Sequence, residues 1–161
     1  MKIIGWIGLV IALLACALVL AGQLGALAAT MPQRQGVKDG KLVQPSRTPN
    51  SVSSQASLYP GHPQQAYAAM EPFRLKEEGG AAMRKLAGQL RAMRGAQLIT
   101  DEPDYLYAQF STPVLKFTDD VEFWLDRQAG VIHFRSASRI GRKDFGVNRA
   151  RMETIRAQLG S

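Results

Sequence analysis

The sequence has 161 residues, of which 46% are hydrophobic, and a formal net charge of +7, so it can form one domain with a modest core. The charge is +4 over residues 31–76, −4 over 77–126 and +6 over 127–161, which allows pairing inside the domain as well as binding of a polyanion. Because no zinc-finger spacing, recognition helix or RNA-binding motif is present, no nucleic-acid partner is expected. The single cysteine, Cys16, excludes an intramolecular disulfide and a cysteine-ligated metal site, and no metal or cofactor is expected.

Residues 3–22 form an apolar run without a charged side chain, and as a helix they would span about 30 Å, the thickness of a bilayer core. This length favours an uncleaved transmembrane signal anchor over residues 1–29, because cleaved leaders usually have shorter apolar cores. A cleaved leader stays open, since residues 26–28 read Ala-Leu-Ala, and so does a lipoprotein with a poor lipobox at residues 13–16. The membrane is therefore an expected partner through residues 3–22.

The charges that flank this run do not decide its orientation. Lys2 precedes it, whereas Arg34, Lys38 and Lys41 follow it, and by the positive-inside rule this favours a cytoplasmic C-terminal side. Short N-terminal tails usually stay inside, which favours the opposite orientation.

Residues 30–63 are rich in Pro, Gln, Ser and Gly, which predicts a flexible tether and irregular lead-in before a domain over residues 64–161. The first predicted element of that domain is a helix over residues 77–94. Its apolar stripe is formed by Met83, Leu86, Leu90 and Met93, which recur at steps of three and four residues. Gly95, just beyond, suits a C-terminal cap.

Alternating and β-branched segments then predict strands joined by short connections. The ranges are 97–100, 105–110, 114–126 with a bend or bulge at Asp119 and Asp120, and 131–135. A last helix is expected over 147–159, with Asp144 as a candidate cap. Because short connections require antiparallel neighbours, we expect an α+β domain in which an antiparallel sheet of three to five strands carries two helices on one face.

Three stretches carry a resemblance to a known family: TPNSVSSQ at residues 48–55, FTDDVEFW at 117–124 and RSASRIGRKDFGVNRAR at 135–151. From about residue 40 to 159 the chain resembles the domain of unknown function 1499 family, found in bacteria and in plant plastids. The resemblance implies no activity, because the family has no agreed one. Its members are often exported or membrane-anchored, which implies a single-pass protein of the bacterial inner membrane with a periplasmic or otherwise extracytoplasmic domain.

Members of that family usually carry a cysteine at the position of Ser51 and another near Pro45 and Ser46, a pair that looks like a disulfide closing the lead-in. Both are missing here. The resemblance therefore implies that packing alone fastens this segment, and the chain's own thiols do not support an extracytoplasmic location.

The basic stretch near the C-terminus contains the candidate ligand site. Alternation along a strand puts Arg135 and Arg139 on one side and Ser136 and Ser138 on the other. Guanidinium groups near the N-terminus of a helix suit carboxylate or phosphate. The predicted ligand-binding residues are Arg135, Ser136, Ser138, Arg139, Asn148 and Arg149, with Asn50 and Ser53 from a facing wall.

The alternative interpretation of these residues is structural. Arg135 and Arg139 would pair with Asp119, Asp120 or Glu122 of the neighbouring strand, at about 0.2–1 kcal/mol for each exposed pair. Asp144 would cap the last helix, and residues 50–54 would hydrogen-bond the edge of the sheet. The two interpretations are compatible, because arginines held by carboxylates are already oriented for a ligand.

Catalysis is not expected. Ser136, Ser138 and His133 supply ingredients of a nucleophilic site, but no G-x-S-x-G elbow is present and His133 shares its side of the strand with Arg135. His62 is the only other histidine, so no zinc site is expected. We expect non-catalytic binding of an anionic small molecule, lipid headgroup or acidic peptide. The alternative is a scaffold or assembly factor acting through protein contacts, with the arginines in internal salt bridges, and a third is a hydrolase-like enzyme.

Overall fold

The computed structural model describes residues 2–30 and 35–161. Arg34, one of the charges that bear on membrane orientation, lies outside the described residues. The helices are α1 (Lys2–Gln23), α2 (Gln65–Ala68), α3 (Gly79–Ala92) and α4 (Val147–Leu159), with a 3-10 turn η1 (Ala56–Leu58). The strands are β1 (Ser51–Ser53), β2 (Phe73–Arg74), β3 (Ala96–Asp101), β4 (Tyr105–Ser111), β5 (Thr118–Asp126) and β6 (Val131–Ser138).

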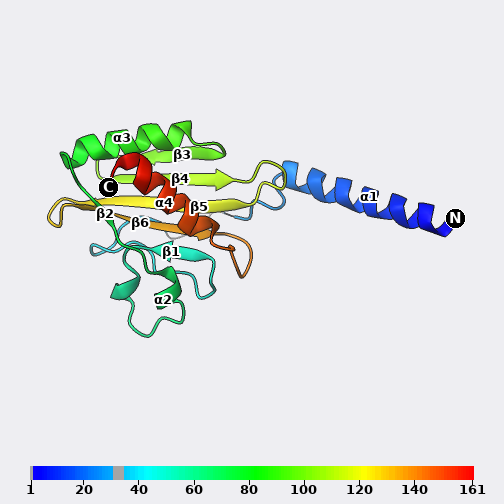
Figure 1. Ribbon diagram of the computed structural model, residues 1–161, viewed down its shortest axis with the longest axis horizontal. Coiled ribbons are helices and arrows are strands. Elements are labelled where there is room, and N and C mark those ends of the chain that lie inside the picture. Colours follow the sequence, from blue (N-terminus) through cyan, green and yellow to red (C-terminus); the bar gives the residue numbers. More distant parts are fainter. Residues whose placement is uncertain (1, 31–34) are drawn as a thin grey trace.

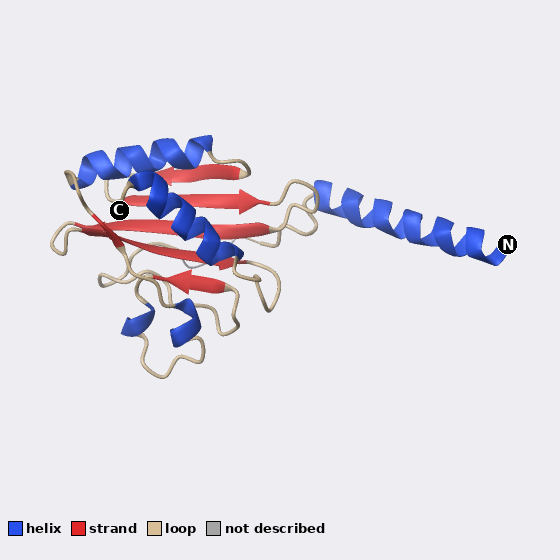
Figure 2. Ribbon diagram, in the orientation of Figure 1, coloured by secondary structure: helices blue, strands red, loops and turns tan. Residues whose placement is uncertain are grey.

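The domain is an antiparallel sheet with α3 and α4 on one face (Figures 1 and 2). The strand order is β1-β6-β5-β4-β3, and β2 pairs with β6 beside β1, which makes six strands. The α+β fold is confirmed, with a slightly higher strand count than the predicted three to five. β1 and β2 have only three and two residues, too short to show an alternating pattern.

The core lies between the helices and the sheet. One cluster joins the apolar stripe of α3, including Leu86 and Leu90, to Met152 and Ile155 of α4. The inward-facing side chains of β4, β5 and β6 complete this cluster, among them Leu106, Phe123 and Phe134, all almost fully buried. Burial of these stripes holds both helices on the same face.

The ends of the two helices follow local hydrogen bonding. The Glu78 carboxylate caps α3 by accepting bonds from the backbone N–H of Gly80 and of Ala81, both at 2.8 Å. At the start of α4, Asp144 accepts from the backbone N–H of Gly146 and of Asn148. Asp144 therefore caps the helix from two residues before its Gly146 boundary.

The bend or bulge expected at Asp119 and Asp120 is wrong. β5 pairs without interruption with β4 and β6 through both residues. Both aspartates stay in the strand because each side chain meets an arginine, Arg151 on the helix face and Arg139 on the other. The irregularity of the sheet lies instead in β3, between Leu98 and Thr100.

The lead-in packs more closely on the domain than a flexible tether would. Leu42 and Val52 are almost fully buried, and β1 pairs with β6. The Gln55 side chain accepts from Leu42 N at 2.8 Å and donates to Gly40 O at 2.9 Å. The packed unit therefore begins well before residue 64, because the sheet edge supplies backbone partners that composition does not reveal.

Helix α1 extends away from the domain (Figure 1). Residues Ile3–Gln23 are long and apolar enough to cross a membrane, and nearly all of this stretch is exposed, with Gly22 buried where the helix meets the domain. Its C-terminal end contacts the β4–β5 loop, where Gln23 Nε2 donates to Pro113 O at 3.2 Å and to Val114 O at 2.6 Å.

Candidate functional site

The predicted ligand-binding residues divide between the two faces of the sheet. Arg135 and the adjoining Arg139 lie on the face opposite the helices, whereas Ser136 and Ser138 point toward α4, as the alternation of a strand requires. The structure therefore places them in two polar networks with the sheet between them.

On the face away from the helices, Arg139 forms a bidentate ion pair with the carboxylate of Asp120, with Nε at 2.9 Å from one oxygen and Nη2 at 2.7 Å from the other. The side chains are only 6% and 2% exposed. Tyr107 donates its hydroxyl to Asp120 at 2.5 Å and accepts from Arg139 Nη2 at 3.1 Å. Burial and the bond to Asp120 raise the pKa of Tyr107, so its hydroxyl stays protonated and continues to donate.

A second buried carboxylate, Glu122, lies beside this group. It accepts from the Tyr105 hydroxyl at 2.8 Å and from Gly36 N at 2.7 Å, and Arg135 Nη1 is 3.5 Å from its other oxygen. Burial, followed by the charge of Glu122, raises the pKa of Tyr105. Arg135 also donates through Nε to Gln44 O at 3.3 Å. The lead-in thus covers this face, and the two arginines have partners within the domain.

The helix-face network is centred on Asn148. Its Oδ1 accepts from Ser136 Oγ at 2.5 Å, and its Nδ2 donates to Asn50 O at 3.2 Å, Ser138 Oγ at 3.1 Å and Asp144 Oδ2 at 2.9 Å. The structure therefore brings four predicted residues together, Asn50, Ser136, Ser138 and Asn148.

Asp144 supports this network from the turn before α4. Burial alone would raise its pKa, but hydrogen bonds from Tyr67 and from the backbone N–H of Gly146 and Asn148 outweigh it and hold the pKa below its ordinary value. Asp144 is therefore a carboxylate that orients Asn148 in the first turn of α4.

Arg151 belongs to the same network, although sequence reasoning did not include it in the site. Its Nη1 donates to Ser136 Oγ at 2.9 Å and to Asn148 Oδ1 at 2.7 Å, and its Nη2 donates to Asp119 at 2.5 Å. Its guanidinium carbon lies 4.6 Å from the centroid of the Phe110 ring. The available signal was the spacing of three residues from Asn148, which puts both side chains on one face of α4.

An open cleft of about 350 Å³ lies beside Arg151, between the end of α3 and the start of α4. Phe110, Met93 and Val147 give it apolar walls, and Asp119 and Arg151 lie at its polar side. Arg94 is exposed at its rim, and no ion pair of this residue is found within residues 2–30 and 35–161.

The two remaining predicted residues lie elsewhere. Arg149 Nη2 donates to the carbonyls of Tyr67 and Ala69 at 2.6 and 3.2 Å. Ser53 is buried in β1, and its Oγ accepts from Gln55 N at 3.1 Å. Both side chains bond the chain's own backbone in the structure.

The model of one protein family, described as a protein of unknown function (DUF1499), matches residues 41–159. The chain belongs to the DUF1499 family. Comparisons with curated proteins and with solved structures found no match. The matched DUF1499 region contains the side chains of both polar networks and the cleft, and α1 lies outside it.

In this DUF1499 domain the lead-in is fastened at the place where the resemblance suggested a cysteine pair. Ser46 donates its backbone N–H to Ser51 Oγ at 2.8 Å. Packing alone was expected here, and the structure adds this hydrogen bond, which the buried Ser51 side chain accepts inside β1.

A serine and a histidine also meet in the DUF1499 domain. Ser54 Oγ lies 3.1 Å from His133 Nδ1, and His133 Nε2 lies 4.0 Å from Asp126. Burial lowers the pKa of His133, against the opposing effect of Asp126. However, the Ser54 hydroxyl also accepts a hydrogen bond from Phe134 N at 2.9 Å, and the backbone N–H of Ser54 donates to Phe134 O. Ser54 therefore extends the pairing of β1 with β6 by one residue.

No cluster of three or more His, Cys, Asp or Glu that could hold a metal occurs in the described part of the chain.

Proposed function

We propose that this DUF1499 protein is a membrane-anchored, non-catalytic domain that binds an anionic group carried on an apolar body, such as a lipid headgroup or an acidic small molecule. The proposed site is the cleft between α3 and α4. Arg94 and Arg151 would bind the anion, and Phe110, Met93 and Val147 would contact the apolar part.

The observation that carries this proposal is that two guanidinium groups lie beside apolar walls. That of Arg151 is already held in place, and that of Arg94 has no ion pair among the described residues. Arg151 is held by Asp119, Ser136 and Asn148, so little side-chain freedom would be lost on binding. Because Asp119 neutralises one of the two arginines, the cleft keeps one net positive charge. The helix-face half of the predicted ligand-binding set would then act by orienting Arg151.

The location is part of the same proposal. Helix α1 would be an uncleaved single-pass anchor in a bacterial inner membrane, with the DUF1499 domain on the extracytoplasmic side. Its support is the length and composition of α1.

A scaffold acting through protein contacts is the second candidate. The observation that favours it is the engagement of Arg135 and Arg139 with Glu122 and Asp120, which suits arginines that serve the fold. In that case no small anion would bind the cleft.

Thermal unfolding of the full chain in a nonionic detergent tests the first candidate. The probes are inorganic phosphate, dihexanoyl phosphatidylglycerol and polyglutamate. At a hundred times its dissociation constant a ligand stabilises the folded state by about 2.7 kcal/mol. For a domain of this size that corresponds to a rise in Tm of about 10 °C.

Two matched variants locate the effect. Arg94→Gln should abolish the shift, whereas Arg84→Gln, an exposed arginine earlier on α3, should keep it. A shift with polyglutamate alone would assign an acidic peptide as ligand. The anion proposal is refuted if no probe shifts Tm, or if both variants respond like the unmodified chain.

A further inference from the structure

Helix α1 ends against one particular end of the domain. Gly22 lies so close to the β4–β5 loop that an added Cβ would be 2.7 Å from Leu115 O, and Gln23 donates to two carbonyls of that loop. Beyond the helix, Arg139 Nη1 donates to Ala28 O at 3.5 Å and to Ala29 O at 3.3 Å. If α1 crosses a bilayer, this end of the domain therefore lies at the bilayer surface.

Two loops share that end of the sheet. Ser111 pairs with Thr118 across the β4–β5 loop (residues 112–117), and Asp119 pairs with Ser138 immediately before the β6–α4 loop (residues 139–146). Both loops lie on the side of the domain from which α1 leaves (Figure 1). We call these two loops, with Val147, the proximal loops.

The proximal loops expose large apolar side chains. Phe145 is 93% exposed and adopts a left-handed backbone conformation with φ +53°, which is rare for an aromatic residue. Val114, Phe117, Ile140 and Val147 are also exposed. A group of this kind at the end of one domain is typical of an interaction surface, and aromatic rings favour the interface of a membrane.

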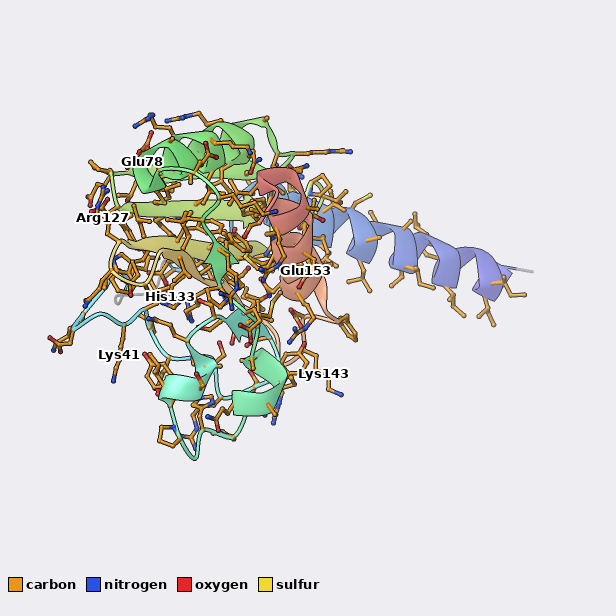
Figure 3. The ribbon with its side chains drawn as sticks, turned by 60° about the vertical axis from the view of Figure 1, so that its left-hand side comes forward. Lys41, Glu78, Arg127, His133, Lys143 and Glu153 are labelled. Carbon is orange, nitrogen blue, oxygen red and sulfur yellow. The ribbon has the colours of Figure 1, made fainter. Side chains whose placement is uncertain are left out.

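The charges of the proximal loops suit an anionic surface. Arg139 is paired with Asp120, whereas Lys116, Arg142 and Lys143 are cations with no ion pair among the described residues. The one acidic residue of these loops, Asp144, is buried and accepts a hydrogen bond from Tyr67. Figure 3 shows Lys143 on the side from which α1 leaves, with Glu78 and Arg127 on the opposite side. Each Lys or Arg near an anionic bilayer favours binding about fivefold.

We propose that the proximal loops dock on the lipid surface of the membrane that α1 enters, with Phe145, Ile140 and Val114 in the interface and the three cations among the headgroups. This inference rests on the anchoring proposed above for α1 and not on ligand binding in the cleft. Gly95, beside the cleft rim, packs on Ser111 at the same end, so docking would bring the cleft to the level of the headgroups.

The experiment measures the depth of nitroxide labels on the full chain in vesicles of phosphatidylcholine and phosphatidylglycerol. One protein carries the label on the native Cys16 in α1. The others combine Cys16→Ser with Phe145→Cys, with Val114→Cys, or with Gln128→Cys in the exposed turn at the opposite end of the sheet. Labels at 145 and 114 should be relaxed more by dissolved oxygen than by a water-soluble nickel chelate, and the label at 128 should show the reverse.

Two outcomes overturn the proposal and are distinguishable. A label on Cys16 that is in water shows that α1 is not in the bilayer, which ends the anchoring proposal and with it the docking. A label on Cys16 in hydrocarbon, with labels at 145 and 114 in water, refutes the docking alone.

A charge-reversal pair tests the headgroup contacts in the same assay. Arg142→Glu with Lys143→Glu should move the label at 114 into water, because both cations are exposed and lie in the proximal loops. Lys38→Glu with Lys41→Glu makes the same change in net charge in the lead-in, where Lys41 lies on the side away from α1 (Figure 3), and should leave the label in the interface. Equal effects of the two pairs would refute a specific role of the proximal loops.

Discussion

Removal of Arg139 should be among the most costly substitutions in this domain. Arg139→Met leaves Asp120, whose side chain is 2% exposed, with the Tyr107 hydroxyl as its remaining side-chain donor within residues 2–30 and 35–161. Breaking a buried ion pair by removing one partner typically costs about 3–5 kcal/mol, because an uncompensated charge stays buried. This cost is a large part of the total free energy of unfolding of a typical domain, which is roughly 5–15 kcal/mol.

Urea unfolding of the full chain in nonionic detergent measures this cost. The double variant Arg139→Met with Asp120→Asn should recover most of the loss, because it removes the isolated charge and keeps an acceptor for Tyr107. Arg127→Met is the matched control: Arg127 pairs with Asp104 in water at the surface, where screening leaves little to lose.

Two results would refute this reasoning. One is a loss for Arg139→Met no larger than that for Arg127→Met. The other is a double variant as unstable as the single one, which would mean that the buried charge of Asp120 is not the source of the cost.

Three further substitutions test the buried polar groups and a tight turn. Because burial lowers the pKa of His133, the unfolded chain binds a proton at this residue more readily than the folded chain does. The free energy of unfolding should therefore fall as the pH drops below about 6.5, by at most about 1.4 kcal/mol per pH unit. Urea titrations at several pH values measure this slope, and His133→Gln should remove it. Tyr105→Phe removes a donor to the buried carboxylate of Glu122 and should cost about 1.5–3 kcal/mol in the same assay, and an unchanged midpoint would contradict the bond. Gly95→Ala should destabilise the domain far more than Gly130→Ala. Both glycines have positive φ, but only at Gly95 would the new Cβ meet a carbonyl oxygen, that of Ser111 at 2.6 Å. Equal losses of Tm in the two variants would argue against this close approach.

Those parts of the fold that repeat a pattern were predictable from the sequence. The stripe from Met83 to Leu90 indicated α3, and the alternation from Val121 to Leu125 indicated β5, because each repeats one period over several turns or pairs. β1 and β2 were not predictable, since strands of two or three residues show no period and form through pairing with β6. The ordered packing of the lead-in was not predictable for the same reason, because it also depends on contacts with the folded sheet.

The sequence predicted which face of the sheet each candidate-site residue occupies, but not which residue it contacts there. Alternation correctly separated Arg135 from Ser136, but it does not show which carboxylate each arginine meets across the sheet. Arg151 was missed because its partners, Asp119 and Ser136, come from two different strands that only the folded sheet brings beneath α4. Contacts of this kind depend on register and helix placement, which one sequence does not specify.

The hydrogen bond from Ser46 to Ser51 has a consequence for biogenesis. A covalent cross-link at this place would require an oxidant, and in many compartments an isomerase, before the lead-in could settle on β6. A backbone N–H and a hydroxyl need neither. The chain can therefore close its lead-in as soon as β1 meets β6, and a reducing agent leaves that closure intact.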